Sequence, residues 1–213
     1  MIDSYRHKGM RKNMLKELSE KGISSTLVIN AMEEVPRHLF LDNAFLEIAY
    51  ENKAFPIGCG QTISHPYTVA FQSQMLDIKK GDKVLEIGTG CGYQTSVLAK
   101  LGAKIFSIER HRPLYIKTKS LLKKLNIRAT LFYGDGYAGQ KAFAPFDKII
   151  VTAAAPYIPD ALVEQLAPQG LMIIPVGEGK QQTMIFITKN EDGTINKTEK
   201  GSFSFVPMLE DKA

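Results

Sequence analysis

The chain has 213 residues, of which 44% are hydrophobic and 23% charged, and its formal net charge is +5. These values are typical of a soluble globular protein, and no apolar run approaches the ~20 residues that a membrane helix needs. The first residues lack the apolar stretch of a secretion signal, and two cysteines are too few for a disulfide framework. We therefore expect a cytoplasmic protein with no membrane partner.

The positive charge raises the possibility of nucleic-acid binding. Basic residues occur near the N-terminus and on a predicted helix at 112–126, but they are spread out. No dense basic run with interleaved aromatic residues is present, so we interpret these charges as a solvated surface and expect no nucleic-acid partner.

Residues 4–50 are predicted to be mostly helical. A helix that ends at Gly22 is followed by a second one, which begins at the serines of residues 24–25 and is stopped or kinked by Pro36. The proline and glycine content of residues 52–66 argues against regular structure there.

From residue 67 onward, predicted helices and strands alternate. The predicted helices cover residues 67–78, 92–102, 112–126 and 159–170. The predicted strands cover residues 83–87, 104–109, 129–134, 146–154, 171–177, a stretch from 183 to a turn at 192–193, and 201–209. Repeated strand–helix–strand units indicate an α/β fold with a mostly parallel sheet between helices, and the last strands indicate an antiparallel pair at one edge.

The strongest motif is VLEIGTGCGYQT, residues 84–95, in which a strand runs into a glycine-rich turn and then a helix. Gly88, Gly90 and Gly92 allow a ligand to approach the backbone closely. The third glycine of a dinucleotide fingerprint would fall on Tyr93, so that fingerprint fails. Glu109 ends the next strand and can accept hydrogen bonds from both ribose hydroxyls, so a nucleoside without a pyrophosphate fits best, and S-adenosylmethionine is the common one.

Three further positions each have two readings. Asp135 ends the third predicted strand and can accept from an adenine amino group, or it can simply form an Asp-Gly turn. Cys91 lies in the glycine-rich turn, where it either exposes the site to oxidation or fills a small space. The Ser64-His65 pair resembles a nucleophile with its base, or it starts a helix at Pro66.

Seven segments together resemble the protein-L-isoaspartate O-methyltransferases over nearly the whole chain. They are VPRHLF (35–40), PIGCGQTIS (56–64), VLEIGTGCGYQT (84–95), GDG (134–136), PFDKIIVTAAAP (145–156), LMIIPVG (171–177) and FVP (205–207). The resemblance implies a Rossmann-like class I methyltransferase fold, with a mostly parallel seven-stranded sheet, an antiparallel edge and extra N-terminal helices. It implies one domain, 1–213, in which 1–66 form the N-terminal helices and a covering loop and 67–213 form the cofactor-binding core.

The implied activity is methyl transfer from S-adenosyl-L-methionine to the free α-carboxylate of L-isoaspartyl residues in damaged proteins and peptides. We also expect a monomer and no metal. The resemblance places Ser64 at the catalytic position. It implies that the cofactor is bound by Gly88, Gly90, Glu109, Asp135 and Gly136. It implies that the substrate is bound by Thr62, Ile63, Val206 and Pro207.

The acceptor's chemistry decides what Ser64 is expected to do. A carboxylate has a pKa of ~4 and is already ionised at neutral pH, so it needs no general base. We therefore expect Ser64 to orient the carboxylate and His65 not to act as a base, while His7, His38 and His111 are predicted to be scattered surface residues.

Two other functions fit parts of the sequence. A methyltransferase acting on RNA or on a small molecule shares the glycine motif, but the segments GQTIS and FVP speak against it. A catalytically silent S-adenosylmethionine-binding module is the second alternative, and the presence of Ser64, Glu109 and Asp135 argues against such decay.

Overall fold

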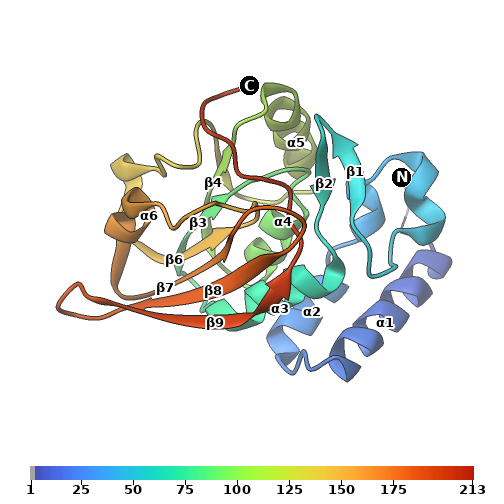
Figure 1. Ribbon diagram of the computed structural model, residues 1–213. Coiled ribbons are helices and arrows are strands. Elements are labelled where there is room, and N and C mark those ends of the chain that lie inside the picture. The colour runs from blue at the N-terminus through green and yellow to red at the C-terminus, as the bar shows by residue number, and fades with distance from the viewer. Residues whose placement is uncertain (1–2) are drawn as a thin grey trace.

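The computed structural model describes residues 3–213, and its centre is one seven-stranded sheet (Figure 1). The strand order is β5-β4-β3-β6-β7-β8-β9. The strands are β3 (Lys83–Ile87), β4 (Lys104–Glu109), β5 (Thr130–Tyr133), β6 (Phe146–Val151), β7 (Leu166–Val176), β8 (Gln182–Lys189) and β9 (Ile195–Phe203). Neighbouring strands from β5 to β7 are parallel, and β8 and β9 add an antiparallel edge, which confirms the predicted sheet.

The chain order of the strands reverses between β3 and β6. From β3 the chain continues to β4 and β5 on one side, and then returns to β6 and β7 on the other. In open α/β sheets, ligands bind in the crevice beyond the carboxyl ends of the strands at such a reversal. The fold therefore places its natural binding crevice at the ends of β3 and β6.

Helices cover both faces of the sheet because its strands are apolar on both sides. In β3, Val84 packs with α3 (Pro66–Leu76) and α4 (Tyr93–Lys100), whereas Leu85 packs in the cluster that includes Leu162 of α6 (Asp160–Gln165). The fifth helix, α5 (Arg112–Lys124), packs beside β4 and β5.

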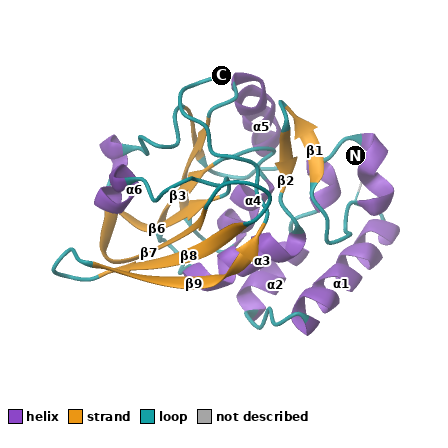
Figure 2. Ribbon diagram, viewed as in Figure 1, coloured by secondary structure: helices purple, strands orange, loops and turns teal. Residues whose placement is uncertain are grey.

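The N-terminal helices form a layer outside α3 and α4 (Figure 2). The Ser4 hydroxyl accepts from His7 N at the start of α1 (Tyr5–Glu20), and the Ser25 hydroxyl accepts from Val28 N at the start of α2 (Thr26–Glu33). Within residues 3–213, two short 3-10 helices follow in this layer, η1 (Arg37–Phe40) and η2 (Asn43–Ile48), and a third, η3 (Lys141–Phe143), precedes β6. One buried apolar cluster joins α1 and α2 to α3 and α4, so this layer is packed onto the core. No helix within residues 3–213 is long and apolar enough to span a membrane.

Residues 52–66 contain regular structure, so the prediction of an irregular stretch is wrong. β1 (Phe55–Gly58) and β2 (Gln61–Ile63) form an antiparallel hairpin, in which Phe55 pairs with Ile63. The hairpin forms because Phe55 and Ile57 are buried while Pro56 and Gly58 point outward. Cys59 and Gly60 make the turn with positive φ angles of 53° and 68°.

Two other predicted boundaries are also wrong. The helix predicted for 159–170 ends at Gln165, because Leu166 pairs with Phe146 of β6 and starts β7. The last strand covers Ile195–Phe203 instead of 201–209. Residues 204–213 continue as the C-terminal tail, drawn in red in Figure 1, which runs across the top of the sheet toward α5.

Candidate active site

The glycine turn after β3 is built so that side chains are excluded from it. Gly88 has a φ of 93°, and a Cβ atom there would lie 2.5 Å from Thr152 Oγ1. The Thr152 hydroxyl is close enough to hydrogen-bond the carbonyl of Gly88 at 2.7 Å, which ties the turn to the end of β6. Gly92, with a φ of 86°, is the N-cap of α4. The turn therefore presents bare backbone to the crevice.

A buried polar cluster lies beneath this turn. The hydroxyls of Thr95 and Ser107 donate to Glu86 Oε2 at 2.6 and 2.7 Å. Thr89 Oγ1 of the turn lies 2.6 Å from Ser107 Oγ, so the chain of hydrogen bonds reaches the turn itself. Burial raises the pKa of Glu86 to about 7, although the two hydroxyl donors lower it. Glu86 thus supports the glycine turn from below.

Glu109, at the end of β4, is fixed by two backbone donors. Gly90 N donates to its Oε2 at 2.7 Å, and His111 N donates to its Oε1 at 2.8 Å. Each carboxylate oxygen can accept more than one hydrogen bond, so both retain capacity for a ligand hydroxyl. The bare glycine backbone and a fixed carboxylate on the next strand fit the ribose and chain of a nucleoside cofactor such as S-adenosylmethionine.

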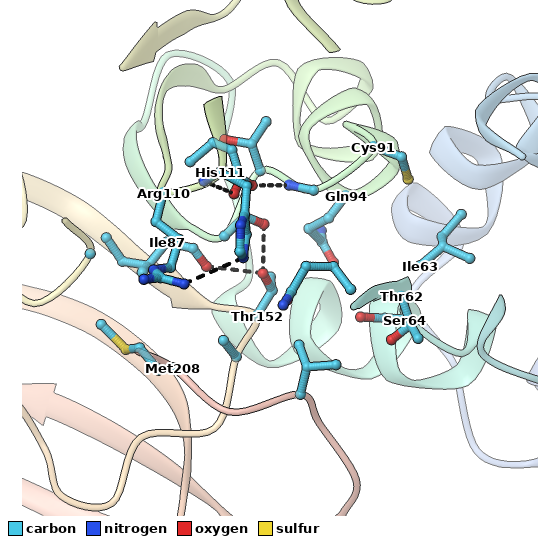
Figure 3. A pocket seen from close by; sticks show the side chains of 18 of the residues that line it. Thr62, Ile63, Ser64, Ile87, Cys91, Gln94, Arg110, His111, Thr152 and Met208 are labelled. Carbon is cyan, nitrogen blue, oxygen red and sulfur yellow. Dashed lines mark hydrogen bonds between the residues drawn. The ribbon is translucent and has the colours of Figure 1, made fainter. Parts of the chain in front are cut away.

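One pocket brings together almost all of the residues predicted from the sequence (Figure 3). Thr62 and Ser64 lie on the side opposite Arg110 and Met208. The predicted residues that line the pocket are Thr62, Ile63, Ser64, Gly88, Gly90, Glu109, Gly136, Val206 and Pro207.

Asp135 is the predicted residue that does not line the pocket. Its carboxylate accepts from Tyr137 N at 2.8 Å and from Asp211 N at 3.3 Å. These contacts match the Asp-Gly turn that was the alternative reading. The predicted contact of Asp135 with adenine stays a prediction.

Ser64 lines the pocket and is not the N-cap of α3. The N-cap of α3 is His65, which makes no side-chain capping bond, and Pro66 is the first helical residue. The Ser64 hydroxyl has no hydrogen-bond partner within residues 3–213, and it lines the pocket. His65 does not line the pocket, and burial together with the charge of Arg37 lowers its pKa.

The C-terminal tail fixes Val206 and Pro207 over the end of β6. Ala154 N donates to Val206 O at 2.8 Å, and Met208 N donates to Ala154 O at 2.6 Å. Further along, Arg110 donates to the carbonyls of residues 210 and 211, each at 3.0 Å. The tail is therefore held on both sides of the pocket.

Several pocket residues were not identified from the sequence. Thr152 follows β6 directly, and its place at a strand's carboxyl end was the available signal. Gln94 donates to Ser73 Oγ at 3.0 Å, and its buried Oε1 has no partner within the described chain. Gln94 lies inside the motif at 84–95, which was the available signal, whereas nothing in the local pattern of Met208 marks it.

The prediction of scattered surface histidines is wrong. His111 lines the pocket, and His38 is buried, with its ring stacked on that of His7 at 3.8 Å between centroids. His38 is internal because η1 packs inward and its Nδ1 lies 2.8 Å from Tyr50 Oη. Asp3, His7 and His38 bring three possible metal-ligand atoms within 4.8 Å, away from the pocket, and Arg11 pairs with the Asp3 carboxylate.

Cys91 lines the pocket and is half-buried, with one side packed against the apolar cluster of the N-terminal layer. Burial raises the pKa of its thiol to about 11. The thiol is therefore protonated at neutral pH, and the thiolate is the form that reacts with oxidants. The raised pKa argues against the reading in which Cys91 exposes the site to oxidation.

Comparison with known proteins shows which family the chain belongs to. The family model for protein-L-isoaspartate(D-aspartate) O-methyltransferase matches residues 9–213. The chain belongs to this family. A protein-L-isoaspartate O-methyltransferase of Christiangramia forsetii is 55% identical to it over 213 residues, covering all of both chains. The Flavobacterium johnsoniae methyltransferase is 53% identical, again over the whole of both chains.

A solved structure agrees with this membership of the protein-L-isoaspartate O-methyltransferases. The methyltransferase of this type from Plasmodium falciparum, crystallised with S-adenosyl-L-homocysteine, superposes with a TM-score of 0.82 at 27% identity. The match covers 94% of this chain and 99% of that one. The protein is thus an S-adenosylmethionine-dependent enzyme that methylates L-isoaspartyl residues, and the class I fold is confirmed.

Proposed function

We propose that the repair methylation takes place in the pocket between the β1–β2 hairpin and the glycine turn, with Ser64 orienting the acceptor carboxylate. The observation that carries this proposal is that Ser64, Glu109 and the glycine turn line the same pocket. The segment GQTIS, which is specific to the family, therefore lines the same pocket as the glycine turn, which class I methyltransferases share.

The cofactor side of the pocket is assigned to Gly88, Gly90, Glu109 and Gly136. When bound, S-adenosylmethionine supplies a methyl group carried on a positively charged sulfur. The Glu109 carboxylate accepts from ribose hydroxyls, and the glycines admit the ligand to the backbone. A Cβ atom at Gly136 would collide with Ile87 Cγ2, so this position also has to remain bare.

The substrate side relies on positioning rather than on proton transfer. A carboxylate with a pKa of ~4 is ionised at neutral pH, so Ser64 has no proton to remove. Its hydroxyl donates to one carboxylate oxygen, and the N-terminus of α3 beside it favours a negative charge. Holding two reactants in the reactive geometry can lower a barrier by up to ~7–11 kcal/mol.

Thr62, Ile63, Val206 and Pro207 supply the cover over the reacting groups. Ile63 is buried, and the tail segment at residues 206–207 is pinned to the end of β6. Apolar cover excludes water, which would otherwise stabilise the separate charges of carboxylate and sulfonium and so slow their reaction.

The proposal also covers the setting in which the enzyme works: a cytoplasmic monomer that acts on damaged proteins and not on nucleic acid. The charge of the pocket supports a protein substrate. Among residues 3–213, Arg110 is the one arginine that lines the pocket and no lysine does so. The Arg110 guanidinium already binds the tail. The described lining of the pocket therefore lacks the row of basic side chains that would bind a phosphate backbone.

Replacing Ser64 tests the proposal. Ser64→Ala removes a hydrogen bond to a charged group, worth about 1.5–3 kcal/mol, so kcat/KM for an isoaspartyl peptide should fall about 10- to 100-fold. Affinity for S-adenosylhomocysteine, measured by calorimetry, should stay close to that of the wild type. Ser120→Ala, an exposed serine on α5, is the matched control. Equal kcat/KM values for Ser64→Ala and wild type would refute this role for Ser64.

A further inference from the structure

We propose that Arg37 is a positioning residue that sets the location of Ser64 by joining the two ends of the β1–β2 hairpin. This inference rests on the role proposed above for Ser64. Arg37 lies at the start of η1, in the N-terminal layer, and does not itself line the pocket.

The contacts of Arg37 define the arrangement. Its Nη2 donates to Lys53 O at 3.1 Å and to Ser64 O at 2.7 Å. Lys53 lies two residues before β1, and Ser64 follows β2 directly, so one nitrogen connects the segments that enter and leave the hairpin. Its Nε donates to Ala49 O at 3.0 Å, which anchors the guanidinium to η2's C-cap.

The cost of burying Arg37 indicates that its role is more than packing. The residue has no exposed surface, and no acidic side chain of the described residues forms an ion pair with it. Its partners are backbone carbonyls and the ring of Tyr93, whose centroid is 4.9 Å from the guanidinium carbon. Removing an unpaired charge from water costs several kcal/mol, which apolar packing alone would avoid.

The charge of Arg37 also acts on the residues around Ser64. It contributes to the lowered pKa of His65, so its field reaches the start of α3. Its Nη1 has no hydrogen-bond partner within residues 3–213, and neither has the hydroxyl of Tyr93, which lines the pocket. A positive charge beside the Ser64 carbonyl therefore adds attraction for an acceptor carboxylate.

Lysine cannot reproduce this arrangement, because its ammonium group is a single point donor whereas the guanidinium is a rigid planar fork. Arg37→Lys keeps the charge but frees one or both ends of the hairpin. A displacement of about 1 Å in a positioning element can cost about 100-fold in rate, and we expect a loss of that order in kcat/KM. Affinity for S-adenosylhomocysteine should change little.

A double-mutant cycle separates positioning from a general effect on the fold. If Arg37 acts through Ser64, Arg37→Lys should cost far less in kcat/KM when Ser64 is already alanine. Arg11→Lys is the matched control, because Arg11 is a buried arginine of the same layer that binds Asp3 and Tyr50 instead of the hairpin. It should lower the melting temperature without lowering kcat/KM.

Each outcome of the cycle decides the question. Additive losses from Arg37→Lys and Ser64→Ala would overturn the proposal, as would an unchanged kcat/KM in folded Arg37→Lys. If that variant does not fold, Arg37→Gln is assayed with and without added guanidinium ion in the presence of S-adenosylhomocysteine. Rescue of activity by guanidinium supports the proposal. Failure of both variants to fold overturns it, because Arg37 would then serve the whole fold. In that case, loss of activity in Ser64→Ala alone would leave the proposed function standing.

Discussion

At the scale of single residues, the pocket depends on side chains that line it, such as Glu109, and on side chains that lie behind the lining, such as Glu86. Glu109 and the glycines could be predicted because a strand end or a glycine spacing marks each one. Thr152 also carries a signal, because it follows a strand directly. The contacts of Thr152 and Arg37 could not be predicted, because their partners are carbonyls distant in sequence, those of Gly88 and Ser64.

Glu86 makes stability depend on pH. Its pKa of about 7 in the folded protein exceeds the ordinary value of 4.5. The contribution of Glu86 to the free energy of unfolding is therefore fully present below pH 4.5 and is lost as the pH rises through 7. At 1.36 kcal/mol per pH unit, this difference predicts a loss of about 3 kcal/mol between pH 4.5 and pH 8. Glu86→Gln should lack this loss. Urea unfolding of both proteins at several pH values measures it.

The control for this prediction is Glu178→Gln, a change at an exposed carboxylate. It should retain the wild-type pH dependence. The prediction is wrong if Glu86→Gln loses as much unfolding free energy as wild type between pH 4.5 and pH 8.

At the scale of elements, the predictions succeed where periodicity is strong and fail where tertiary contacts decide. The strands β3, β4 and β6 could be read from their apolar runs. The β1–β2 hairpin could not, since its proline and glycines conceal an alternation of only four residues. The local sequence predicts a helix at Leu166, but this residue starts β7 because it pairs with Phe146.

Lys189 of β8 stabilises the C-terminal end of α6, and substituting it tests this role. Its Nζ donates to the carbonyls of Val163, Glu164 and Leu166, at and just beyond the C-terminal end of α6. Lys189→Met should therefore reduce the free energy of unfolding by about 1–2 kcal/mol, with kcat/KM unchanged. Lys197→Met, on the exposed strand β9, is the control and should reduce it much less. Equal losses in the two variants would contradict this account.

At the scale of the whole molecule, the order of helices and strands predicts the parallel sheet. The strand order of that sheet then determines where the pocket lies. The reversal between β3 and β6 brings the glycine turn next to Thr152, while the hairpin and the C-terminal tail close over it from two sides. We propose that residues 1–66 and 67–213 act as one domain, since a single apolar cluster connects the N-terminal layer to α3 and α4.

The central claim is that this pocket methylates isoaspartyl residues in proteins, and methyl transfer tests it most directly. The protein is incubated with methyl-labelled S-adenosylmethionine and paired peptides that contain either isoaspartate or aspartate at one position. We predict base-labile label, released as methanol, from the isoaspartyl peptide and not from its partner. Equal labelling of both peptides, or labelling of added RNA in place of either, would contradict the account.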